Sequence, residues 1–133
     1  MKIRKVVEQL GVSAETLRYY ERIGMIPHIP RDENGDRNYE AIHLEWIQGI
    51  LQLKSTGMSI EMLVDYVQLA ILGANTAETR KGILEEERLR IEKEIAILNR
   101  SLSILDHKIN DYYTEVLPKT ENLVHDIQGD QDK

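Results

Sequence analysis

Apolar residues recur every seven positions along the C-terminal half of the chain, and this pattern constrains the fold more than any other feature. One series comprises Leu84, Ile91, Leu98, Leu105 and Tyr112, and a second comprises Ile95, Leu102, Ile109 and Val116. In heptad notation these are d and a positions, which line one side of a long helix. About 30–40 helical residues would span roughly 45–60 Å. A seam of that length needs a partner helix, and a second copy of the chain is the simplest one.

The charges beside this seam leave the orientation of the two helices open. From Leu84 onward the charged e and g positions are acidic except for Lys108. In an antiparallel pair g faces g, so Lys108 could meet an acidic residue of the partner. That contact does not exclude a parallel pair.

Residues 1–26 predict two short helices joined by a tight turn. Helically spaced apolar residues end at Gly11, and Ser13 is suited to cap the next helix. On that helix Leu17 and Tyr20 can face a core. The opposite face carries Glu15, Arg18, Tyr19 and Arg22. Guanidinium groups and an aromatic ring suit phosphates and base edges in a DNA major groove, so we expect a helix-turn-helix whose second helix reads DNA.

The next segment predicts a two-stranded wing. Two prolines prevent helix there, and Asn34-Gly35 favours a tight hairpin turn because both residues tolerate positive φ. Arg31 and Arg37 flank the turn and could grip phosphates beside the groove. The alternative is a solvated hairpin with two scattered arginines, but its place directly after a helix-turn-helix favours the wing.

Further helices are expected downstream. Residues 41–56 predict a third helix, with an apolar stripe of Ile42, Trp46, Ile50 and Leu53. Ser59 is expected to cap a fourth helix, and Lys54 near the intervening turn is either a phosphate contact or a free surface lysine. Thr76 is expected to cap the long helix and Pro118 to end it. Thr120 could cap a final short helix, and residues 129–133 are expected to be disordered.

Four pieces of the sequence, in order and correctly spaced, resemble the MerR family of bacterial transcription regulators. They are residues 17–21, 24–27, 31–39 and 54–60. The resemblance implies a mostly α fold, with a winged helix-turn-helix DNA-binding domain over residues 1–72. It also implies an antiparallel coiled-coil dimerisation helix over residues 73–117, followed by a short helix and tail over residues 118–133.

The same resemblance implies a function. Such regulators bind a pseudo-palindromic site in double-stranded promoter DNA as homodimers and act on RNA polymerase indirectly, by bending and untwisting the spacer. Arg18 and Tyr19 are the expected groove contacts. The other expected DNA-binding residues are Ser13, Thr16, Arg22, Arg31, Arg37, Tyr39 and Lys54. The alternative is an architectural, excisionase-like adaptor that bends DNA and whose coiled coil recruits another protein.

The composition limits other chemistry. The chain carries a net charge of −6, but residues 1–57 hold equal numbers of basic and acidic residues, so the excess lies in residues 58–133. DNA binding would therefore need the N-terminal arginines to converge into a local basic surface. The chain has no cysteine, which excludes a disulfide, a thiolate metal site and a thiol sensor. Residues 60–113 resemble the aldehyde-responsive branch of the family, in which some members carry a cysteine near the position of Gln52.

No motif suggests an enzyme. The histidines are widely separated, and the sequence has no phosphate loop or nucleophile elbow. We therefore expect no catalytic residue, no metal site and no cofactor. No apolar run approaches the ~20 residues of a membrane span, so we expect a soluble cytoplasmic protein without a membrane partner. The sequence leaves open a small-molecule effector, the operator and the sign of regulation.

Overall fold

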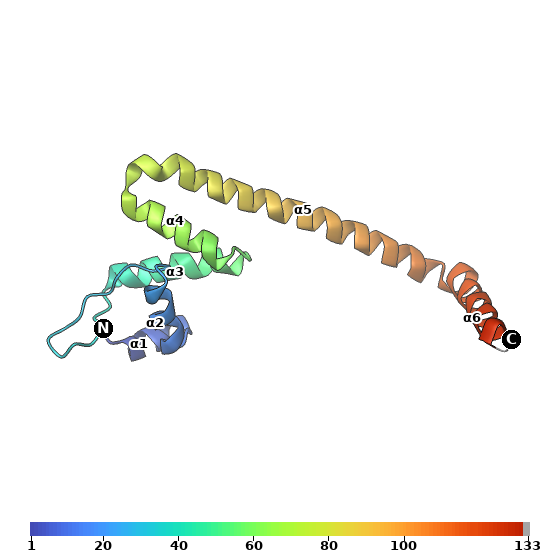
Figure 1. Cartoon of the computed structure of the whole chain (residues 1–133), viewed down its shortest axis with the longest axis horizontal. Coiled ribbons are helices and arrows are strands. Elements are labelled where there is room, and N and C mark those ends of the chain that lie inside the picture. The colour runs from blue at the N-terminus through green and yellow to red at the C-terminus, as the bar shows by residue number, and fades with distance from the viewer. Residues whose placement is uncertain (132–133) are drawn as a thin grey trace. The chain divides into compact units, whose positions relative to one another are not determined.

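The computed structural model describes residues 1–131, which belong to two compact units, Met1–Glu87 and Arg88–Lys133. The first unit contains helices α1 (Ile3–Leu10), α2 (Ala14–Arg22), α3 (Ala41–Ser55) and α4 (Ile60–Leu72), the short 3-10 turn η1 (Ala74–Thr76) and the start of α5 (Ala77–Asn110) (Figure 1). The second contains the rest of α5, the π-helical turn η2 (Tyr112–Val116) and α6 (Leu117–Gln131). The boundary between the units falls inside α5.

The predicted helix-turn-helix is present. Gly11 ends α1 in the left-handed conformation with φ 69°, which glycine adopts without a steric penalty. Ser13 then caps α2, because its hydroxyl oxygen accepts a hydrogen bond from the backbone N–H of Thr16 at 3.1 Å. Leu17 and Tyr20 are buried, as their spacing predicted. This burial orients α2 and leaves its opposite face in solvent.

The core of the first unit joins all four helices and the loop between α2 and α3. Its buried side chains include Val6, Leu17, Tyr20, Met25, Ile26, Ile29, Tyr39, Ile47, Ile50, Met58, Leu63 and Val67. The predicted stripe on α3 is wrong at its first member, because Ile42 lies exposed in the first turn, whereas Ile50 is buried as predicted and Ile47 is buried beside it. Trp46 and Leu53 flank these two residues and are partly buried.

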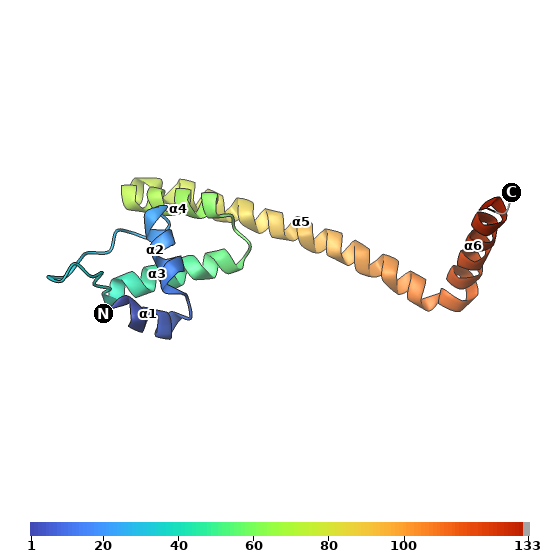
Figure 2. The same cartoon turned by 60° about the horizontal axis from the view of Figure 1, so that its bottom comes forward.

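The expected wing is a loop with one antiparallel bridge, between Arg31 and Arg37, rather than a pair of strands. The chemistry of the loop explains this. Pro30 has no N–H to offer the opposite arm, and the Asp32 carboxylate accepts the N–H groups of Asn34 and Asp36 at 2.9 and 3.0 Å. The turn also differs from the predicted one, because Gly35 has a positive φ of 80° but Asn34 does not. The loop projects away from the helices in both views (Figures 1 and 2).

The second unit bends earlier than predicted. Helix α5 ends at Asn110, and the carbonyl oxygen of Asp111 accepts hydrogen bonds from the N–H groups of both Glu115 and Val116 in the π-helical turn. The prediction that Pro118 ends the helix is therefore wrong: Pro118 lies in the first turn of α6, where a missing N–H is tolerated. Thr120 does not cap that helix, since its hydroxyl donates to the carbonyl oxygen of Val116 at 2.8 Å.

Helix α5 begins at Ala77, directly after Thr76, as predicted, but the Thr76 hydroxyl serves the preceding helix. It lies 2.6 Å from the Leu69 carbonyl oxygen and 2.8 Å from that of Gly73, so it satisfies the end of α4. Gly129 belongs to α6 rather than to a disordered tail. Residues 132–133 lie outside the part of the chain that the structure describes.

The heptad seam of the second unit is uncovered in the single chain. Its apolar side chains from Ile95 to Ile109 are between 51% and 70% exposed. In the first unit, by contrast, Leu84 at the start of the seam is half-buried. Among the described residues, no helix is both long enough and apolar enough to cross a membrane.

Candidate nucleic-acid interface

The residues that the sequence predicted as groove contacts lie on the exposed face of α2. Arg18, Tyr19 and Arg22 are all exposed. The Arg22 guanidinium carbon lies 5.3 Å from the centre of the Tyr19 ring, a cation–π arrangement that orders both side chains. Together with Thr16 and Glu15 they line a shallow hollow of about 370 Å³. This face can offer hydrogen-bond donors and an aromatic edge to DNA bases.

The Ser13 and Thr16 side chains are also on this helix, but they contact each other. The Ser13 hydroxyl donates to the Thr16 hydroxyl at 2.8 Å. Their first role is therefore to start α2 at a defined residue. A direct DNA contact by either one remains a prediction.

Beside α2, basic residues from three parts of the chain surround a second hollow of about 400 Å³. Its lining residues are Lys2, Ile3, Arg4, Arg18, Arg31, Asp36 and Arg37. The start of α1, the middle of α2 and both arms of the wing loop meet there. The convergence of arginines that DNA binding would require is thus present in the first unit, although that part of the sequence is neutral overall.

Sequence reasoning missed Lys2 and Arg4. They reach the hollow because the backbone of Met1 pairs with that of Tyr39: Met1 N donates to the Tyr39 carbonyl oxygen at 2.9 Å, and Tyr39 N donates to the Met1 carbonyl oxygen at 2.8 Å. Lys2 Nζ also lies 3.4 Å from the Asp36 carboxylate in the wing loop. The basic residues at positions 2, 4 and 5 were a visible signal, but the contact that brings them to the wing is not local in sequence.

The two wing arginines are held differently. The Arg31 guanidinium donates to the Gly35 carbonyl oxygen at 2.9 Å, within the loop itself. Arg37 Nε donates to the Glu21 carboxylate on α2 at 2.8 Å. A guanidinium has five N–H groups, so each arginine keeps donors for a phosphate after these contacts.

Tyr39 is not on the surface where the sequence placed it. Its side chain is only 1% exposed, and its hydroxyl has no hydrogen-bond partner among the described residues. Burial raises the pKa of the Tyr39 phenol, against an opposing effect of Arg37. In this structure the Tyr39 hydroxyl is therefore buried in the core and is not offered to a phosphate.

Lys54 lies on the exposed side of α3, outside both hollows. Its Nζ donates to the Tyr20 hydroxyl at 2.5 Å. The lysine is therefore not a free surface side chain, which was the alternative interpretation. A phosphate contact would add to this bond or replace it.

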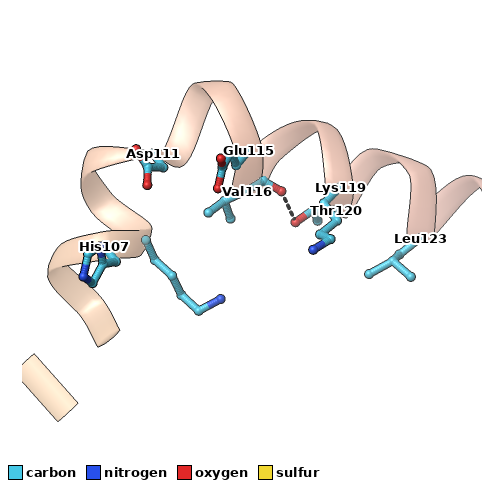
Figure 3. A pocket seen from close by; sticks show the side chains of 8 residues that line it. His107, Asp111, Glu115, Val116, Lys119, Thr120 and Leu123 are labelled. Atoms are coloured by element: carbon cyan, nitrogen blue, oxygen red, sulfur yellow. Dashed lines mark hydrogen bonds between the residues drawn. The ribbon is translucent and has the colours of Figure 1, made fainter. Parts of the chain in front are cut away.

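A third hollow, of about 300 Å³, lies in the second unit at the bend between α5 and α6. Figure 3 shows His107 and Asp111 on one side of the bend and Lys119 and Leu123 on the other. Charges of both signs line it, whereas Asp36 is the one acidic residue in the hollow beside α2. Among the described residues, no group of three acidic or histidine side chains is placed to hold a metal ion. An anion is therefore best accommodated beside α2.

Comparison with known proteins identifies the family. The sequence profile described as "MerR HTH family regulatory protein" matches residues 1–69. The chain belongs to the MerR family. The regulator AdhR of Bacillus subtilis is 44% identical over 91 residues, which cover 68% of this MerR-family chain and 65% of AdhR.

Two solved structures extend the similarity beyond the first unit. A MerR family transcriptional regulator from Listeria monocytogenes is 40% identical, with 98% of each chain covered and a TM-score of 0.74. HiNmlR, described as a MerR family regulator that lacks the sensor domain and is bound to promoter DNA, is 34% identical with a TM-score of 0.69. That match covers 84% of this MerR-family chain and 88% of HiNmlR.

Proposed function

We propose that this MerR-family regulator binds a pseudo-palindromic promoter site as a homodimer and controls transcription by distorting the DNA between its half-sites. The observation that carries the proposal is the basic hollow in which α1, α2 and the wing loop meet. It lies directly beside the exposed Arg18, Tyr19 and Arg22 of α2. One surface thus combines donors for base edges with cations for phosphates.

The residues divide into two roles. Arg18 and Tyr19 contact base edges in the major groove, with Arg22 ordered against the Tyr19 ring. Arg31 and Arg37 bind phosphates beside that groove. Lys2 and Arg4, which line the same hollow, bind phosphates next to them. Charge-assisted hydrogen bonds from arginine to phosphate are strong and directional, so these contacts set the position of α2 on the duplex.

The exposed seam supports the dimer. Apolar side chains that are half or more exposed over several heptads are expected to bury themselves against a partner helix. We propose an antiparallel pair of α5 helices, which places one DNA-binding unit at each end. HiNmlR, whose structure contains promoter DNA, supports the promoter as the binding target. Promoter binding would place the protein in the bacterial cytoplasm, with RNA polymerase as an indirect partner, and it requires no catalytic activity.

Binding to matched and scrambled duplexes tests the function. The purified chain should bind DNA from the promoter upstream of its own gene more tightly than a scrambled duplex of equal length, by the factor of ~10³ or more that separates specific from non-specific binding. The affinity should fall steeply with salt, because phosphate contacts release counterions. Equal affinity for both duplexes would contradict the proposal.

The oligomeric state separates this function from that of an architectural adaptor. In the absence of DNA, a homodimeric regulator sediments at twice the monomer mass of 15.4 kDa. An adaptor whose coiled coil recruits another protein would sediment as a monomer when purified alone.

A further inference from the structure

Glu21 is a largely buried acidic residue bonded to Arg37, which lines the basic hollow. It lies on α2, and its side chain is only 9% exposed. One carboxylate oxygen is 2.8 Å from Arg37 Nε in the wing loop, and the other is 3.4 Å from Nδ1 of the exposed His28. A carboxylate so close to a DNA-binding surface should repel phosphate, so its presence calls for a reason.

The contact between Glu21 and Arg37 explains why a carboxylate lies there. Arg37 is 19% exposed and comes sixteen residues after Glu21, so the bond ties the wing loop to the recognition helix. It occupies Nε and leaves the terminal N–H groups of the same guanidinium for another acceptor. Arg37 also lines the hollow that Arg18 and Arg31 share. The three guanidinium groups repel one another, and the nearby carboxylate of Glu21 offsets part of that repulsion.

We propose that Glu21 is a positioning residue for DNA binding: it fixes the Arg37 guanidinium in the orientation that meets a phosphate and so sets the wing loop against α2. The inference rests on the proposed function, because it concerns how the same surface binds DNA. A flexible arginine must be ordered when it binds, and an arginine that is already held in place avoids that cost. Glu21 therefore strengthens DNA binding although its charge opposes the phosphate.

The sign of one substitution separates this role from simple electrostatics. Glu21→Ala removes a negative charge near DNA, which by charge alone should tighten binding. If Glu21 positions Arg37, the same substitution weakens binding about tenfold, the scale of one charge-assisted hydrogen bond. Glu21→Gln keeps an acceptor for Arg37 Nε, so we expect it to restore most of the affinity. The matched control is Glu8→Ala, since Glu8 is an exposed carboxylate on α1 that lines neither hollow of the DNA-binding surface, so its removal should leave binding unchanged or slightly tighter.

The dependence on Arg37 distinguishes positioning from a loss of folded protein. Affinity is measured by fluorescence anisotropy on the duplex that the wild-type chain protects, over a range of salt. Arg37→Ala should lower the salt slope by about one phosphate contact. Adding Glu21→Ala to Arg37→Ala should then have no further effect on affinity. Equal or tighter binding by Glu21→Ala, or full additivity of the two substitutions, would overturn the proposal. If the wild-type chain itself shows no preference for its promoter, the proposed function fails instead.

Discussion

Truncation of one seam residue should weaken the dimer by an amount that the exposure of its side chain sets. Leu102 lies at an a position near the middle of the seam and is 57% exposed in the single chain. Fully burying a leucine side chain contributes about 1.5–3 kcal/mol, so the part still exposed corresponds to about 0.9–1.7 kcal/mol. Because the dimer contains two copies of Leu102, Leu102→Ala removes most of this burial free energy from each of them. The dimer should therefore lose about 2–3 kcal/mol, a rise of about 30- to 150-fold in its dissociation constant.

Sedimentation equilibrium over a range of protein concentrations measures this constant directly. Leu89→Ala is the matched control, because Leu89 is 51% exposed on the same helix but occupies a b position outside the seam. Its dissociation constant should stay within about twofold of the wild-type value. A dimer equally weakened by both substitutions, or by neither, would refute the reasoning that the a and d positions form the interface.

Four further substitutions test the binding surface and its support. Arg31→Ala should weaken binding to all DNA sequences and lower the salt dependence of the affinity by about one phosphate contact. Arg18→Ala should in addition reduce the preference for the promoter over scrambled DNA. Gel shifts at several salt concentrations measure both effects. Tyr39→Phe should leave the thermal midpoint unchanged or raise it, because it removes a buried hydroxyl without a partner. Burial raises the pKa of the Tyr39 phenol, so the stability that the neutral phenol contributes is fully present below the unfolded pKa of about 10. That stability is lost as the pH rises through the pKa of the folded state. Tyr39→Phe should therefore lose less stability than the wild type when urea unfolding is measured at alkaline pH. Gly35→Ala should destabilise the wing loop by about 1 kcal/mol, since φ is +80° there, and hydrogen exchange of the loop should report it.

The last three of these each have a contrary outcome. Equal losses on promoter and scrambled DNA would exclude a base-reading role for Arg18. A Tyr39→Phe variant that melts below the wild type would show that the hydroxyl has a partner in solution. Unchanged exchange in Gly35→Ala would mean that the loop does not hold the left-handed turn.

Much of the fold could be predicted because the signals are local. Gly11 and Ser13 mark the turn between α1 and α2 by their own conformational preferences, and the spacing of Leu17 and Tyr20 identifies the buried face. Ser59 likewise marks the start of α4, where its hydroxyl accepts from Met62 N at 3.1 Å. In each case the residues that carry the pattern also make the contact.

The sequence-based predictions were wrong where contacts between residues far apart in the sequence determine the structure. Tyr39 was expected on the surface, but the pairing of its backbone with Met1 places its ring in the core. The Glu21–Arg37 bond joins two elements with no shared local pattern, so no spacing predicted it. The break in α5 occurs at Asp111 without a proline or glycine there, whereas the proline that suggested a break lies at a tolerated position of α6. The sequence could thus identify the arginines of α2 and of the wing loop as site residues, but not how they are arranged around the hollow.

A footprint of the purified chain on the promoter upstream of its own gene, with a cleavage reagent that responds to DNA distortion, tests the central claim most directly. The account predicts symmetric protection of two half-sites in the spacer between the promoter elements, with hyper-reactive base pairs at the centre. Protection without symmetry, or symmetric protection without central distortion, would contradict a dimer that regulates by distorting promoter DNA.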